Sequence, residues 1–136
     1  PFSTISNYFV VNFILWIIVC DFIFYINHRL LHTRSLFFIH KQHHEYNFTY
    51  GAGAIYAHPL DFIFANLFPI GVPFIIFNIP YFHCVLIIVF SSFFTVVFSH
   101  GGYFNNQSHL LHHLKKMGNY GLIYTDRLFN TVLSSD

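Results

Sequence analysis

Eleven histidines in a chain of 136 residues are its chemically most informative feature. Eight of them form three motifs, "HRLLH" at 28–32, "HKQHH" at 40–44 and "HLLHH" at 109–113. Their spacings of three or four residues place the histidines of each motif on one face of a helix. Because imidazole binds iron, copper, zinc and nickel, each HxxHH motif offers two ligands to one metal ion and a third to its neighbour. The predicted ligands are His28, His32, His40, His43, His44, His109, His112 and His113.

Two further histidines stand alone beside turn-forming residues. His58 precedes Pro59, and His100 precedes a pair of glycines, each at the edge of an apolar run. We expect both to complete the metal site, which would then hold ten imidazoles. His83 lies inside the second apolar block, near its turn, and is not expected to bind metal.

The acidic residues are too few to be the main ligands. The chain has five, and none repeats at ligand spacing, so a carboxylate-rich di-iron bundle is excluded. Metal-bound imidazoles usually donate their second N–H to a carboxylate or carbonyl. We expect this support from Asp21, Glu45, Asp61, Asn119 and Asp126. Asp21 shares a helix face with His28, but an unconnected charge at a helix end would explain its position equally well.

The elements that position these residues are those of an integral membrane protein. The chain is 55% hydrophobic and only 8% charged, and its net charge of +1 excludes nucleic acid as a partner. Residues 7–26 are long enough to cross a bilayer as a helix that continues into "NHRLLH". Residues 62–98 are too long for one span, and "NIP" at 78–80 is a turn signal, so we predict a helical hairpin over 61–77 and 81–99.

A hairpin returns the chain to the side of the membrane that it left. The histidine motifs before and after it then share one side, together with all six Lys and Arg residues, and the positive-inside rule makes that side cytosolic. The sequons at Asn47 and Asn106 would therefore remain unmodified, and no disulfide is expected between Cys20 and Cys84. The prediction is one all-α membrane domain over residues 1–136 with a cytosolic, helical, histidine-rich metal site. The absence of an initiator Met fits a fragment without upstream spans.

Six segments in this order resemble the fatty acid hydroxylase/sterol desaturase superfamily. They are "HRLLH", "HKQHH", "YAHPLD", "SHGGY", "HLLHH" and "NYGLIYTDRLF", and the pattern over residues 21–131 is most similar to the C-4 methylsterol monooxygenases. The chain departs from that pattern at Asp61, where Glu is usual, at Leu110 for Asp and at Asn130 for Gly. The stretch 101–108 is also shorter than is usual in the family.

The resemblance implies an endoplasmic-reticulum enzyme with two iron ions that uses dioxygen. Electrons would come from NAD(P)H through cytochrome b5 and its reductase, and the substrate would be a lipid, either a sterol or an acyl chain. Sterol C-4 methyl oxidation is the expected reaction, with fatty acid hydroxylation or sterol desaturation as alternatives. A non-catalytic membrane protein that binds zinc is the alternative of another class. A metal transporter fits less well, because its ligands would lie within the spans.

Overall fold

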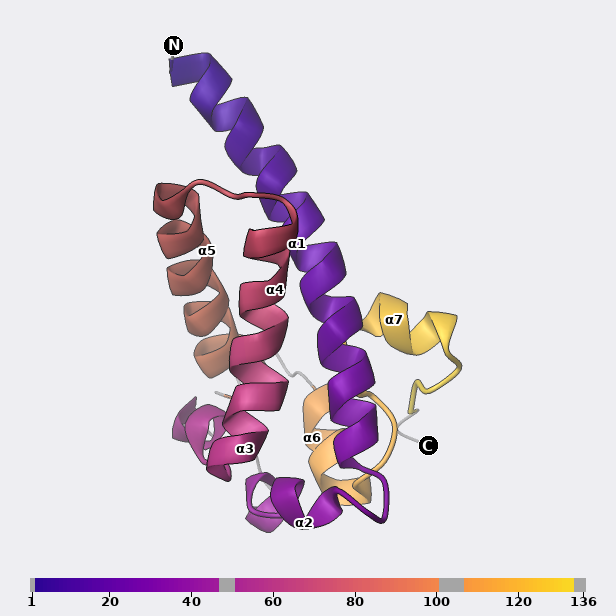
Figure 1. Cartoon of the computed structure of the whole chain (residues 1–136). Coiled ribbons are helices and arrows are strands. Elements are labelled where there is room, and N and C mark those ends of the chain that lie inside the picture. Colours follow the sequence, from indigo (N-terminus) through magenta and orange to yellow (C-terminus); the bar gives the residue numbers. More distant parts are fainter. Residues whose placement is uncertain (1, 47–50, 101–106, 134–136) are drawn as a thin grey trace.

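The structure is a computed structural model that describes residues 2–46, 51–100 and 107–133. Within these ranges every regular element is a helix, as the sequence predicts. Two long antiparallel helical arms pack beside one longer helix, and short helices gather at one end of all three (Figure 1). Three helical stretches are long and apolar enough to cross a membrane: Tyr8–Leu31, Pro59–Ile76 and Tyr81–Ser99.

The first helix, α1 (Phe2–Leu31), runs without interruption from the apolar run into the first histidine motif. Its 30 residues correspond to about 45 Å, which exceeds a hydrocarbon core of about 30 Å. The continuation predicted from the absence of Gly and Pro is therefore confirmed. It carries His28 on the last turn of the helix and places His32 directly after it.

The hairpin is also confirmed, with arms at Pro59–Ile76 and Tyr81–Ser99. The first arm joins α3 (Pro59–Asp61), the π-helix η3 (Phe62–Leu67) and α4 (Phe68–Ile76). The second joins α5 (Tyr81–Phe94) to a second π-helix, η4 (Thr95–Ser99). Pro69 lies in the first turn of α4, where a residue without a backbone N–H is tolerated.

Aromatic packing and a few polar contacts hold the hairpin against α1. Trp16 is buried and stacks on Phe74, and its indole N–H donates to the carbonyl of Ile70 at 3.0 Å. His83 is buried in α5, where its ring lies against Phe9 and its Nδ1 is 3.3 Å from the amide of Asn12. His83 is the third residue of α5 and thus lies near the hairpin turn, at the opposite end of this arm from His100.

The short helices stand at the other end, where the chain enters and leaves the hairpin. They are α2 (Phe37–His40), the 3₁₀-helices η1 (His43–Glu45) and η2 (Gly51–Ile55), α6 (Gln107–Lys115) and α7 (Ile123–Leu128). "HLLHH" lies on α6, as its spacing predicts. "HKQHH" does not form one continuous helix, because α2 ends at His40 and a turn precedes η1. Asn47 and Asn106 lie outside the described residues.

Candidate metal centre

Nine histidines form two neighbouring groups at this end of the molecule. In each group the candidate ligand atoms all lie within 4.8 Å of one another. The five-histidine group consists of His28, His32, His40, His44 and His112. The four-histidine group consists of His43, His100, His109 and His113. Residues on both sides of the hairpin thus meet in the same groups, which agrees with the predicted return of the chain.

Each HxxHH motif is divided between the two groups. His40 and His44 belong to the five-histidine group, whereas His43, between them in sequence, belongs to the other. On α6 the division is reversed, because only His112 contributes to the five-histidine group. The groups are in contact, since the rings of His44 and His113 have centroids 4.6 Å apart. The geometry can therefore place two metal ions side by side.

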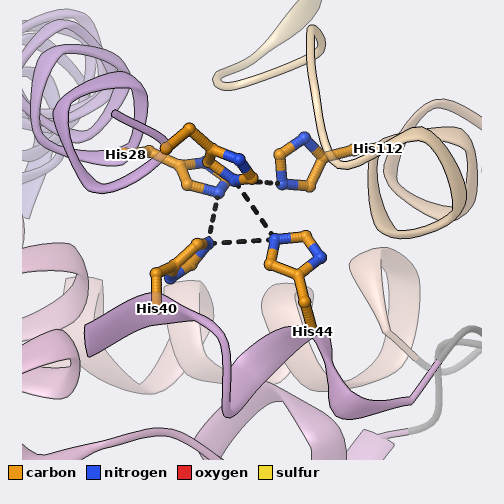
Figure 2. Close-up of side chains that lie close together, drawn as sticks. His28, His40, His44 and His112 are labelled. Carbon is orange, nitrogen blue, oxygen red and sulfur yellow. Dashed lines mark hydrogen bonds between the residues drawn. The ribbon is translucent and has the colours of Figure 1, made fainter. Parts of the chain in front are cut away.

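In the five-histidine group, the rings point inward through the Nε2 atom. Figure 2 shows His28, His40, His44 and His112 facing a common centre. The Nε2 atom of His40 lies 3.0 Å from that of His28 and 3.1 Å from that of His44. The Nε2 atom of His32 lies 3.2 Å from that of His112.

Four of the five outward Nδ1 atoms of this group are held by acceptors, whereas the described residues supply none to the buried Nδ1 of His44. Three of them face backbone carbonyls of the loop that follows α6: His28 Nδ1 with Tyr120 O at 2.7 Å, His32 Nδ1 with Lys116 O at 3.0 Å and His112 Nδ1 with Gly118 O at 2.6 Å. The fourth, His40 Nδ1, lies 2.9 Å from the carboxylate of Asp61. A carbonyl or carboxylate only accepts, so the proton of each of these rings is on Nδ1.

This assignment decides what can lie at the centre. With the protons on Nδ1, the Nε2 atoms of His28 and His40 carry lone pairs and cannot hydrogen-bond to each other across 3.0 Å. Several lone pairs therefore converge on one buried point. Such a donor set fits a metal cation, because metal-ligating histidines have the same pattern of an oriented outer N–H and a free inner nitrogen.

The four-histidine group is similar but has fewer fixed partners. The Nε2 atom of His109 lies 2.8 Å from that of His100 and 3.1 Å from that of His113. His100 Nδ1 donates to the carbonyl of Thr95 at 3.3 Å, and His113 Nδ1 to that of Tyr46 at 3.2 Å. For the other two imidazoles, no Nδ1 hydrogen bond occurs within the described ranges.

Burial favours the neutral form of seven of these imidazoles. Desolvation, followed by neighbouring histidines, lowers the pKa of His112 to about 2. For the same main reason the pKa of His32 falls to about 3 and that of His100 to about 4. Burial also lowers the pKa values of His43, His44, His109 and His113. A neutral imidazole is the form that binds a metal ion.

His58 is the one predicted ligand that the structure leaves outside both groups. It precedes α3, and its Nδ1 accepts from the backbone N–H of Leu60 at 3.2 Å. This is a helix-capping contact, for which the following Pro59 at the first helical position is typical.

Of the five residues expected to support the ligands, only Asp61 hydrogen-bonds to an imidazole within the described part of the chain. Glu45 is exposed and accepts from the hydroxyl of Tyr56. The remaining three are buried and bind backbone around the loop after α6: Asp21 accepts from Leu122 N, Asn119 bonds Ser108 O and Leu133 N, and Asp126 accepts from Tyr120 N and Gly121 N. Asp21 therefore orients neither His28 nor a facing ligand directly.

The loop carbonyls that orient three ligands could not be predicted from the sequence. Every residue has a carbonyl, so no residue type signals that Lys116, Gly118 and Tyr120 orient ligands. An indirect signal exists in "MGNYG", whose Gly and Asn are turn formers placed directly after a ligand motif. Gly118 and Asn119 have positive φ values of 64° and 47°, which turn the chain back over the imidazoles.

The helical membrane fold and the paired histidine groups define a class of membrane proteins built to hold metal ions. The sequence profile of the fatty acid hydroxylase family matches residues 13–131, and the chain belongs to this family.

The chain is similar to relatives that are named for different lipid-related activities. It is 33% identical over 126 residues to methylsterol monooxygenase 1 of Danio rerio, an alignment that covers 79% of this chain and 42% of the relative. It is 32% identical over 130 residues to a very-long-chain aldehyde decarbonylase of Oryza sativa, covering 82% and 48%. To fatty acid hydroxylase domain-containing protein 2 of Homo sapiens it is 29% identical over 125 residues, covering 86% and 37%. The chain thus spans less than half the length of these three relatives. No solved structure matches it significantly.

Proposed function

We propose that the chain is the metal-binding core of a di-iron membrane oxygenase that acts on C–H bonds of lipids. The observation that carries this proposal is the convergence of Nε2 atoms in the five-histidine group, four of them unprotonated, beside a second group of four histidines. Five nitrogen ligands exceed the four of a structural zinc site and suit iron, which accepts more ligands. When bound, a pair of irons would supply the activation of dioxygen.

The residues of the chain orient the ligands and exclude water from the site. The Nδ1 bonds of His28, His32 and His112 fix the ring orientation before a metal arrives, so little reorganisation is needed on binding. His44 and His112 are 2% and 0% exposed, which limits access of water to the centre of the five-histidine group.

An apolar path for a lipid leads to the four-histidine group. Phe94 and Phe98 stack with centroids 4.9 Å apart on the arm that ends at His100. Exposed apolar side chains continue along α5 toward the hairpin turn. A lipid chain lying on this arm would reach the four-histidine group from within the bilayer.

The expected reaction is oxidation of a C-4 methyl group of a sterol. The named methylsterol monooxygenase among the relatives supports it, together with the six motifs. The endoplasmic reticulum, a cytosolic metal site and electron delivery from NAD(P)H through cytochrome b5 and its reductase belong to the same proposal. Fatty acid hydroxylation and sterol desaturation at the same site remain the enzymatic alternatives. A non-catalytic zinc protein is favoured only by the four-histidine group, whose ligand number equals that of structural zinc.

The proposal is tested with the full chain in lipid nanodiscs. We expect two irons per chain and, with NAD(P)H, reductase and cytochrome b5, transfer of ¹⁸O from labelled dioxygen to the C-4 methyl carbon of a methylated sterol. His43→Ala should abolish this transfer, whereas His83→Ala should retain it, because His83 lies near the hairpin turn. Zinc in both groups, or no oxidation of any sterol or acyl lipid by the iron-loaded chain, would refute the oxygenase proposal.

A further inference from the structure

One loop orients most of the five-histidine group. Residues 116–122 follow α6 and direct three alternate carbonyls, at positions 116, 118 and 120, at three imidazoles. The imidazoles come from two different elements, α1 and its end for His28 and His32, and α6 for His112. The position of this loop therefore decides whether three ligands present free Nε2 atoms to the same point.

The loop has no regular hydrogen-bond ladder and depends on a buried carboxylate. Asp126 in α7 is 2% exposed and contacts no imidazole in the described structure. Its two oxygens accept from the backbone N–H groups of Tyr120 at 2.9 Å and Gly121 at 3.0 Å. Fixing the Tyr120 N–H and the next N–H along the chain fixes the peptide plane that carries the Tyr120 carbonyl, which is the acceptor for His28.

A directed chain of side-chain hydrogen bonds ends on the same carboxylate. Thr131 Oγ1 donates its proton to Asp126 Oδ1 at 2.7 Å. Thr131 Oγ1 must therefore be the acceptor in its contact with the hydroxyl of Tyr25 at 3.2 Å. The hydroxyl of Tyr25 in turn accepts from Arg29 Nη1 at 3.0 Å. Tyr25 and Arg29 belong to α1, the same helix that carries His28. This series of hydrogen bonds therefore connects the loop to the helix that carries His28, the ligand that the Tyr120 carbonyl orients.

The surroundings leave this loop little freedom to shift. At Gly118, where φ is positive, an added Cβ would lie 2.6 Å from Leu133 Cγ and 2.8 Å from Thr131 O. At Gly121 an added Cβ would meet Thr125 and would lie 3.0 Å from Asp21 Oδ1. The backbone of residues 118–121 is thus packed directly against α1 and the C-terminal segment.

We infer that Asp126 is a positioning residue for the five-histidine group: through the Tyr120 peptide it holds the proton of His28 on Nδ1 and its lone pair toward the metal. This inference rests on the proposed function, because the Nδ1-protonated tautomer of His28 is required only if the five-histidine group binds a metal ion. Its geometry is independent of which lipid is oxidised.

Replacement of Asp126 by Asn separates this role from simple stabilisation. An amide keeps the size of the side chain, but its NH₂ group cannot accept a hydrogen bond. At least one of the three present donors therefore loses its acceptor. A purely structural role predicts a lower melting temperature and equal effects on all imidazoles. Positioning predicts that His28 changes while His40, whose Nδ1 is held by Asp61, does not.

The test uses ¹⁵N-histidine-labelled, metal-free full chain in bilayers, studied by solid-state NMR, with His28→Gln to assign the resonance. In the unmodified chain we expect His28 to be protonated on Nδ1 alone. In Asp126→Asn we expect a population protonated on Nε2, with His40 unchanged. Glu45→Gln is the matched control, because it removes one exposed carboxylate that contacts no imidazole.

A second pair of variants keeps the inference testable if Asp126→Asn does not fold. Thr131→Val removes the hydroxyl that donates to Asp126, and Thr131→Ser retains it. Thr131→Val should shift the His28 tautomer in the same direction and lower the metal affinity of the five-histidine group, and Thr131→Ser should restore both. For Asp126→Asn, the affinity loss should be about 10- to 100-fold, the range for residues that orient ligands.

The outcomes separate this inference from the proposed function. An unchanged His28 tautomer in both Asp126→Asn and Thr131→Val overturns the positioning role, whatever metal is bound. A shifted tautomer in a chain that binds zinc or oxidises no lipid supports positioning and refutes only the oxygenase proposal. Equal shifts of His28 and His40 would show general loosening and also overturn the inference.

Discussion

The two histidine groups differ in how firmly their imidazoles are held before a metal arrives. In the five-histidine group, four Nδ1 atoms have fixed acceptors, three carbonyls and one carboxylate. In the four-histidine group, two Nδ1 atoms have such acceptors, and both bonds are longer, at 3.2–3.3 Å. His43 and His109 of this group are only partly buried, as is His32 of the five-histidine group, whereas His44 and His112 are fully enclosed.

We expect the two histidine groups to differ in metal affinity and in access for substrate. A preorganised group loses little entropy when it binds, so the five-histidine group should take up metal first and retain it longer. The four-histidine group stands at the end of the apolar arm and has fewer fixed rings, which leaves room for substrate to approach.

Removal of a ligand should affect one group more than the other. His112→Ala deletes a ring that is 0% exposed, and we expect the five-histidine group to lose its metal while the other group retains at least part of its own. His109→Ala should have the opposite result. The loss of affinity should exceed the roughly 100-fold upper range for residues that only orient ligands.

Metal content per chain, measured by mass spectrometry after dialysis, checks this prediction. We expect about one ion in each variant and two in the unmodified chain. His83→Ala serves as the control for loss of a histidine as such. Complete loss of both ions from each variant would show that the groups bind as one unit and would remove the distinction between them.

Removal of the carboxylate behind His40 should have a smaller effect. Asp61 Oδ2 lies 2.9 Å from His40 Nδ1, and both side chains are buried. In Asp61→Asn an amide oxygen can still accept, but without the charge that makes such a bond strong. We expect a loss of about 10-fold in affinity at the five-histidine group alone, measured by competition with a chelator. An equal loss at the four-histidine group, or the same loss in Glu45→Gln, would contradict a local role.

The helices and the grouping of the histidines could be predicted from the sequence where side-chain type and spacing carried the signal. Apolar length gave α1 and the hairpin, and the turn at Asn78 to Pro80 was found from its residues. The return of the chain then brought motifs about 70 residues apart to one end, and the structure groups nine of the ten predicted ligands. His58 resembled them in type, but helix capping explains the same residue before Pro59.

The sequence was less informative where backbone atoms act. Asn119 and Asp126 were expected to contact imidazoles, and instead they hold the loop whose carbonyls do so. The break in "HKQHH" after His40 was also hidden, because the i, i+3 spacing of His40 and His43 suits an α-helix and a 3₁₀-turn alike. Hydrogen bonds to the backbone decide the roles of Asn119 and Asp126, and residue type alone does not identify those partners.

The smallest expected effect is a pH dependence of stability in the metal-free chain. The pKa of His32, in the five-histidine group, is lowered to about 3, and that of His100, in the four-histidine group, to about 4. Since both values lie below the usual 6.5, the unfolded chain binds protons first as the pH falls. Stability is therefore fully present above about pH 6.5 and declines toward the folded pKa, by about 1.4 kcal/mol per pH unit for each proton taken up on unfolding.

Replacement of either histidine by glutamine should remove one such proton and flatten the decline. Thermal melting of the metal-free chain in nanodiscs between pH 7.5 and 5 measures the slope. Above pH 5 both imidazoles remain neutral when folded, so His32→Gln and His100→Gln should reduce the slope by similar amounts. A slope that His32→Gln leaves unchanged while His100→Gln flattens it would mean that His32 is already protonated or exposed, and the five-histidine group would not be the more preorganised one.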